Sequence, residues 1–409
     1  MRARIRGATV AGVLAVSLVV PATSAGAVDQ GHGKPPHGQK QRVMQLVRDY
    51  FVARDKGWLG SQGADAAVTR LADGQADEQP LKAASDLARI ADEVAAERGL
   101  RAREVHTGVA AGPHVQIRGR KATVSATAGT FLAWNDEALG NSTLSDRYEV
   151  ELERVEKTWH IVHVAYAPIP STEATSPSAT GPRPMVPAPS KAAAQAAASG
   201  TYNRQRAAEY ARVWSRSGTL AGTEWLVGDQ YNPDYDQFGN DCTNFASQML
   251  HDGGWSKADG IDNENPDNWT DDLWGPRGPS KTWSVASWLY DYAGNPKRGE
   301  KWAVGSPADA EDIWQLQPGD LLFVDWDPNG RPDGSIDHTM LISGTYTELG
   351  FTEPTYSQHT PHRNNIPLSI GIKIATADPP TENPDGPMSG QGRRLVFYPV
   401  HIKDTFQTG

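Results

Sequence analysis

The chain has 409 residues, of which 38% are apolar, and a formal net charge of −10. Thirteen tryptophans and this apolar share are enough for packed cores, so the composition excludes a disordered chain, and the length predicts two or three domains. The acidic balance argues against a nucleic-acid partner, because phosphate binding requires clustered Lys and Arg. A single cysteine excludes an intramolecular disulfide.

The first residues predict export. Three arginines in MRARIRG precede the apolar run ATVAGVLAVSLVV, and Ala25, Gly26 and Ala27 supply the small residues of a signal-peptidase site. We therefore expect a signal peptide over residues 1–27. The run has 13 residues, whereas a membrane span requires about 20. The expected protein is secreted, either extracellular or associated with the cell wall, and has no transmembrane segment.

Two shifts in composition divide the remaining chain. Residues 28–40 are rich in Gly, Pro and His and predict a disordered arm, and residues 169–200 are rich in Pro, Ala, Ser and Thr and predict a linker. The linker separates an N-terminal unit, residues 41–168, from a C-terminal unit, residues 201–409. The first carries 16 Lys/Arg against 18 Asp/Glu and the second 16 against 29, so the acidity belongs to the C-terminal unit.

The N-terminal unit predicts a small α+β domain. Helical periodicity predicts helices over residues 41–55 and 80–99, the second ending at a glycine. Alternating apolar and polar residues then predict strands over residues 121–135, 146–157 and 158–168, with a turn at residues 141–143. Helices followed by antiparallel strands resemble the nuclear-transport-factor-like architecture. Nothing in this unit indicates a reaction.

The cysteine lies at the start of a predicted helix in the C-terminal unit. In NDCTNFASQML, apolar residues recur at helical spacing, and a Gly pair ends the run: Cys242, Phe245, Ala246, Met249 and Leu250, then Gly253 and Gly254. An earlier helix is predicted after an Asn203 cap.

Two interpretations of Cys242 are open at this point. A cysteine on an apolar stripe is commonly an inert packing residue. In the first turn of a helix, behind Asn240 and Asp241, it can instead be a nucleophile, because free backbone N–H groups and the helix dipole favour a thiolate. The same N–H groups can donate to an oxyanion.

A cysteine nucleophile needs a base, and two histidines are candidates. His338 opens the strand-like run DHTMLISG, which follows the turn and apolar strand LQPGDLLFVDW. His359 ends the short strand-like run TYSQH. Polar groups that orient an imidazole are therefore expected on neighbouring strands, although either histidine alone is also consistent with a structural role.

The order of these segments resembles a known family. NRQRAAEYA, YNPDYDQFGNDCTNFASQMLHDGG, KTWSVASWLYDY, LQPGDLLFVDWD, DHTMLISG and QHTPHRNNIPLS occur as in a bacterial putative amidase domain family, which is similar to the NlpC and CHAP groups of papain-like cysteine hydrolases. The resemblance covers residues 203–400. It implies a papain-like α+β domain, with a nucleophile helix packed on an antiparallel sheet.

The resemblance also assigns roles and a reaction. It makes Cys242 the nucleophile, His338 the base and His359 the third polar member, with Asn365 or Asp337 as alternatives for that third position. The implied activity is amide hydrolysis through an acyl-thioenzyme, with peptidoglycan or a peptide as substrate. The alternative is a non-catalytic module on the same fold that binds the cell wall or a partner.

Two further patterns bear on ligands. Trp269 and Trp274 flank turn residues and are expected either to pack in the core or to wall a cleft for sugar or peptide. DWDPNGRPD begins like a calcium loop, but its twelfth position is Ile336 rather than Glu, so it predicts a solvated turn. We therefore expect neither a metal nor another cofactor.

Overall fold

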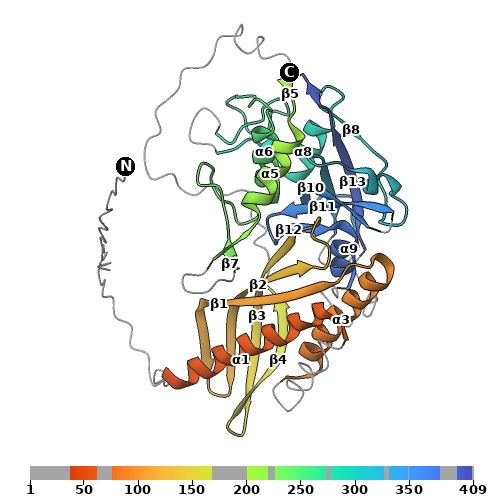
Figure 1. Ribbon diagram of the computed structural model, residues 1–409. Helices are drawn as coiled ribbons and strands as arrows, with labels where there is room; N and C mark the ends of the chain where they lie inside the picture. The colour runs from red at the N-terminus through yellow and green to blue at the C-terminus, as the bar shows by residue number, and fades with distance from the viewer. Residues whose placement is uncertain are drawn as a thin grey trace, which may run out of the picture. The chain divides into compact units, whose positions relative to one another are not determined.

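The computed structural model describes residues 37–61, 76–167, 200–219, 226–272, 278–326, 331–348, 350–377 and 394–407. The described chain is mixed α+β and is built around a large antiparallel sheet, as expected at that level (Figure 1). The predicted signal peptide lies outside these residues, as does nearly all of the predicted linker. The first helix begins at His37, inside the segment expected to be a disordered arm.

Helices and a meander of four strands form the N-terminal part. Its elements are α1 (His37–Asp55), η1 (Lys56–Leu59), α3 (Glu78–Arg98), β1 (Ala102–Arg118), β2 (Lys121–Trp134), β3 (Asn141–Val155) and β4 (Thr158–Tyr166). Gly99 ends α3 in the left-handed region at φ 71°, a conformation that favours glycine. Residues 141–143, expected as a turn, instead open β3.

The C-terminal part contributes shorter elements. They are β5 (Gly200–Thr201), α5 (Arg204–Trp214), β6 (Ser217–Thr219), β7 (Leu226–Asp229), α6 (Cys242–Asp252), α7 (Lys281–Ser284), α8 (Ala286–Ala293), β8 (Gly299–Lys301), η2 (Glu311–Gln315), β9 (Leu321–Asp325), β10 (His338–Glu348), β11 (Phe351–Gln358), β12 (His362–Pro367), α9 (Leu368–Ala377), β13 (Val396–Ile402) and β14 (Thr405–Phe406). Asn203 caps α5, as predicted, by accepting a hydrogen bond from the backbone N–H of Arg206.

One sheet contains strands of both parts. Its order is β1-β2-β3-β12-β11-β10-β9-β13-β8, with β4 also paired to β3. β2 pairs with nearly all of β3, whereas β4 pairs only with residues 148–155 on the other edge. Residues 143–145 of that edge pair with β12. Because β4 ends opposite Tyr148, the edge of β3 before that residue is available to β12, which lies more than 200 residues later in the sequence.

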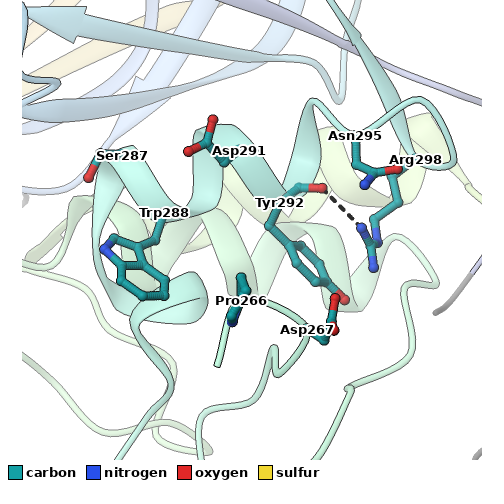
Figure 2. A pocket seen from close by; sticks show the side chains of 8 residues that line it. All are labelled: Pro266, Asp267, Ser287, Trp288, Asp291, Tyr292, Asn295 and Arg298. Carbon is teal, nitrogen blue, oxygen red and sulfur yellow. Dashed lines mark hydrogen bonds between the residues drawn. The ribbon is translucent and has the colours of Figure 1, made fainter. Parts of the chain in front are cut away.

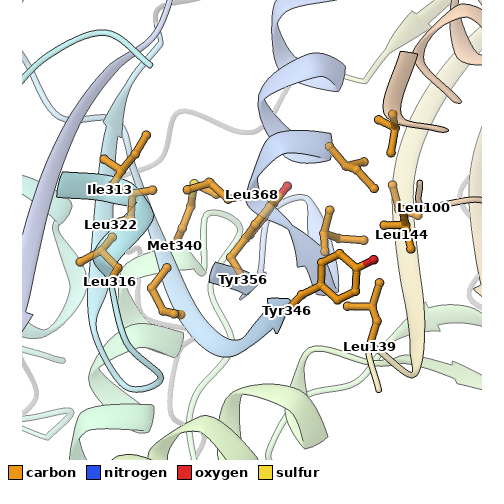
Figure 3. Packing of buried hydrophobic residues seen from close by; sticks show 14 of the residues in the cluster. Leu100, Leu139, Leu144, Ile313, Leu316, Leu322, Met340, Tyr346, Tyr356 and Leu368 are labelled. Atoms are coloured by element: carbon orange, nitrogen blue, oxygen red, sulfur yellow. The ribbon is translucent and has the colours of Figure 1, made fainter. Parts of the chain in front are cut away.

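Three apolar clusters support this sheet. α1 packs on β2–β4, and α5, α6 and α8 pack on residues of β9, β10 and β13. The third cluster joins Leu100, Leu139 and Leu144 to Met340 and Tyr356 (Figure 3). Burial of apolar surface is the main stabilising term in folding. Because this third cluster contains residues of both parts, each part contributes to the folding stability of the other. In the described residues no helix has the length and hydropathy of a membrane span.

Candidate active site

Helix α6 begins at Cys242, as the apolar periodicity predicts. Asp241 occupies the N-cap position, but its side chain does not cap the helix. Its Oδ1 instead accepts hydrogen bonds from the backbone N–H of Phe238, at 3.1 Å, and from Nδ2 of Asn244, at 2.8 Å. The Asp241 side chain therefore leaves the first-turn N–H groups of α6 uncapped, and the backbone of Thr243 hydrogen-bonds to the Cys242 thiol.

The thiol of Cys242 is buried, with 3% of the residue exposed. It lies 3.4 Å from Oδ1 of Asn240 and 3.6 Å from Oγ1 of Thr243, and the backbone of Thr339 hydrogen-bonds to it. Burial raises the pKa of the Cys242 thiol above its ordinary value, and the hydrogen bonds from Thr243 and Thr339 lower it by less. The resting group is a thiol rather than the thiolate expected from the helix dipole alone.

His338 is the first residue of β10 and is equally buried. Its ring stacks on Trp326 with centroids 4.6 Å apart, and the side chain of Gln358 hydrogen-bonds to it. Its Nε2 has no hydrogen-bond partner among the described residues. Burial lowers the pKa of His338 to about 4, so the imidazole is neutral near pH 7 and has a nitrogen available to accept a proton.

A direct contact joins the starts of α6 and β10. Oγ1 of Thr243 lies 3.1 Å from Oγ1 of Thr339, and these residues directly follow Cys242 and His338 in the sequence. The Thr339 backbone also bonds the thiol. The structure therefore brings the start of α6 and the start of β10 into contact, although these residues are 96 apart in sequence, while Nε2 of His338 makes no hydrogen bond to the thiol.

A third catalytic member should hydrogen-bond to His338 and orient its ring. His359 instead contacts Asp241 and Trp214. Its Nδ1 lies 2.6 Å from Oδ2 of Asp241, its Nε2 donates to the carbonyl oxygen of Trp214 at 2.8 Å, and its ring stacks on Phe245. Both ring nitrogens are engaged, so His359 holds Asp241, the residue before the nucleophile. The residue that hydrogen-bonds to His338 is Gln358, which directly precedes His359 and which no sequence pattern indicated.

The two alternatives for the third position are also placed. The Asn365 side chain accepts from Oγ1 of Thr355 at 2.8 Å and donates to the carbonyl oxygen of Leu139 at 2.7 Å. Asp337 accepts from the backbone N–H of Trp326 at 3.1 Å. The Asn365 amide is thus committed to a contact with the N-terminal part, whereas Asp337 supports the segment that carries the Trp326 ring.

Trp269 does not wall a cleft. It is fully buried, and its Nε1 donates to Oγ of Ser247 at 3.1 Å while its ring stacks on Tyr292. It belongs to the core, which was the other role expected for it. Trp274 lies outside the described residues.

A cavity of about 340 Å³ lies elsewhere, along α8 (Figure 2). It is lined by Pro266, Asp267, Ser287, Trp288, Asp291, Tyr292, Asn295 and Arg298. The lining combines two aromatic rings with carboxylates, an amide and a guanidinium. Such a mixture suits a ligand that both donates and accepts hydrogen bonds.

The predicted turn with calcium-loop character is only partly described. Asp325 is buried, and its Oδ2 accepts from the backbone N–H of Gly334 at 2.8 Å. Asp327 and Asn329 lie outside the described residues. Within the part of the chain that the structure describes, no three His, Cys, Asp or Glu side chains form a group suited to a metal ion.

Known proteins match parts of this chain. An uncharacterized protein of Bacillus subtilis (strain 168), YhbB, is 29% identical over 143 residues, which cover 34% of this chain and 37% of that protein. The intermembrane space region of chloroplast protein ARC6 matches 31% of this chain and 94% of its own, at 18% identity and a TM-score of 0.23. Kfla4162 from Kribbella flavida matches 32% and 89%, at 13% identity and a TM-score of 0.24. The resemblance predicted above is confirmed by a family model: the model described as "Putative amidase domain" matches residues 201–378 of this chain.

Proposed function

We propose that the C-terminal part hydrolyses an amide bond, with Cys242 as nucleophile and His338 as base. The observation that carries the proposal is the contact of the Cys242 thiol with the backbone of Thr339, the residue after His338. Residues 201–378 match a family model for a putative amidase domain, and this contact supports a pairing of the only cysteine of the chain with the neutral imidazole of His338. A nucleophile beside a base is the arrangement that covalent amide hydrolysis requires.

The protonation states define the first step. Both groups are neutral at rest, so Nε2 of His338 accepts the thiol proton as sulfur attacks the amide carbonyl carbon. The resulting imidazolium gives that proton to the amine nitrogen as the C–N bond breaks, which leaves a thioester on Cys242. Water, deprotonated by the same imidazole, then attacks the thioester and releases the carboxylic acid and the thiol.

Two neighbouring features assist this chemistry. Gln358 bonds the imidazole of His338 and so fixes the ring orientation, leaving Nε2 for the thiol proton. The oxygen of the tetrahedral intermediate becomes negative, and the uncapped first-turn N–H groups of α6 are donors of the kind that stabilise such an oxyanion.

We further propose a peptidoglycan substrate for a secreted enzyme. The export signal expected at residues 1–27 favours a substrate outside the cell. The cavity on α8 supports a polymer that contains sugar, because a neutral sugar offers hydroxyl groups to Asp267 and Asn295 and an apolar ring face to Trp288. Peptidoglycan presents amide bonds beside such sugars.

A specific observation favours one alternative, a non-catalytic binding module on the same fold. Cys242 is buried and its thiol pKa is raised, as in a packing cysteine. Digestion of purified cell wall with the full-length protein, followed by mass spectrometry, separates the two. We expect released fragments from wild type and from His251→Gln, a matched control whose ring faces the Trp255 carbonyl, but not from Cys242→Ala or His338→Gln. Equal release by Cys242→Ala contradicts the cysteine mechanism.

A further inference from the structure

We infer that β3 of the N-terminal part positions the amidase site, by holding the segment from His359 to Asn365. The inference rests on the proposed function, since the segment holds the residue that precedes the nucleophile. β12 pairs with β3 through three residue pairs: His362 with Ser145, Arg363 with Leu144 and Asn364 with Thr143. The site strand is therefore bordered by the N-terminal part rather than by solvent.

Hydrogen bonds around Asn365 close one end of this contact. Ser142 Oγ donates to the Asn365 carbonyl at 2.6 Å and accepts from the Trp134 indole at 2.8 Å, and Asn365 Nδ2 donates to the Leu139 carbonyl at 2.7 Å. Asn365 has a φ of 52°, which a residue with a side chain adopts rarely. The contacts with β3 and the preceding loop hold it in this unfavourable conformation.

A buried ion pair between Arg363 and Asp146 is a second contact between β12 and β3. Arg363 Nη2 lies 2.9 Å from Asp146 Oδ1, and less than a tenth of each side chain is exposed. Arg363 also donates to the Ser145 carbonyl at 3.5 Å. Because an unpaired buried charge is strongly unfavourable, Asp146 fixes where Arg363, and with it β12, can lie.

Two stacked histidine rings of this segment connect it to Asp241, the residue before the nucleophile. The His362 ring stacks on His359 with centroids 4.2 Å apart, and His359 Nδ1 lies 2.6 Å from Asp241. Asp241 is the residue before Cys242 and donates its backbone N–H to Thr360 Oγ1 at 3.0 Å. A shift of β12 away from β3 is therefore transmitted to the start of α6. Asp146 and Ser142 act as positioning residues, since neither touches the reacting groups.

Conservative variants of the full-length protein test the inference. Asp146→Asn removes the partner of Arg363, and Ser142→Ala removes one hydroxyl. Asp86→Asn, in an exposed helical ion pair with Lys82, is the matched control. One readout is kcat and KM on a soluble amide. The other is the alkylation rate of Cys242 by iodoacetamide, which needs no catalysis and reports one site because the chain has one cysteine.

We expect Asp146→Asn to lower kcat by about tenfold or more, with KM nearly unchanged, and to change the alkylation rate about fivefold, because both depend on where the thiol lies. Ser142→Ala should act in the same direction but less, and Asp86→Asn should match wild type. Near-UV circular dichroism confirms that each variant is folded. If Asp146→Asn is not folded, the kcat and the alkylation rate of Ser142→Ala test the inference.

The double variant Asp146→Asn/Arg363→Met separates positioning from general stability. It removes the uncompensated charge, so thermal stability should recover while kcat stays low. The inference is overturned if the alkylation rates of Asp146→Asn and Ser142→Ala equal that of Asp86→Asn, or if the double variant regains full kcat. If wild type alkylates normally but hydrolyses nothing, the proposed function fails, and the alkylation rates still decide the positioning role.

Discussion

Replacing His338 by glutamine should make the stability of the protein less sensitive to acid. Burial lowers the pKa of His338 to about 4, against about 6.5 for an exposed histidine. Between these values the unfolded chain binds a proton that the folded protein does not. The stability that the neutral, buried imidazole contributes is complete above pH 6.5 and is lost as the pH falls towards 4.

The difference of 6.5 minus about 4 fixes the size of the effect. At 1.36 kcal/mol for each pH unit, wild type loses about 3 kcal/mol of unfolding free energy over the whole window, and about 2.5 kcal/mol between pH 7 and pH 4.5. His338→Gln cannot take up this proton. Other acid-sensitive groups, including His362, whose pKa burial also lowers, contribute equally to both proteins and cancel in the comparison.

Urea unfolding at pH 7 and pH 4.5, followed by tryptophan fluorescence, measures this difference. Wild type and the His251→Gln control should lose about 2.5 kcal/mol more between these pH values than His338→Gln. The same pKa should appear in catalysis as an acid limb of kcat/KM near pH 4, because the base must be neutral. An acid limb near pH 6.5, or equal losses of stability in all three proteins, refutes the reasoning.

Four other outcomes are expected. Cys242→Ala and Cys242→Ser should each lose at least about two to three orders of magnitude in kcat, measured on a soluble amide, because the covalent route is gone. Gln358→Leu should lower kcat by about tenfold at unchanged KM and move the acid limb to lower pH, since the Gln358 hydrogen bond raises the pKa of His338. Trp288→Ala should slow digestion of cell wall and leave turnover of a small soluble amide unchanged; equal effects on both substrates contradict a sugar site. Residues 201–409 alone should lack the near-UV circular dichroism of the full chain, because Tyr356 and Met340 lose apolar partners, and a native spectrum contradicts this.

The local patterns predicted the elements that carry the site. The apolar stripe of α6 placed Cys242 in the first helical turn, and alternation placed His338 at the start of a strand. β1 was not predicted, because Gly108, Ala110 and Ala111 give it no apolar alternation. It becomes a strand by pairing along the edge of β2, which is a tertiary effect.

The role of His359 was beyond the reach of local patterns. Its two partners, Asp241 and Trp214, lie 118 and 145 residues away in sequence, and no periodicity relates them. Gln358 was missed although it adjoins His359, because a glutamine in a strand-like run carries no distinctive spacing. The sharing of one sheet by both parts was equally hidden, since the pairing of β3 with β12 depends on where β4 ends.

The short β4 has a consequence for the order of events during synthesis. β1 to β4 form a meander of neighbouring strands, which needs only short loop closures and can assemble while the rest of the chain is still being made. Residues 143–145 at the edge of β3 then have no strand partner until β12 has been synthesised. A chain that stops before Asn365 contains Cys242 but lacks a complete β12, the strand that we infer positions the start of α6. The arrangement that we propose for hydrolysis therefore forms late, after nearly the whole polypeptide has been made.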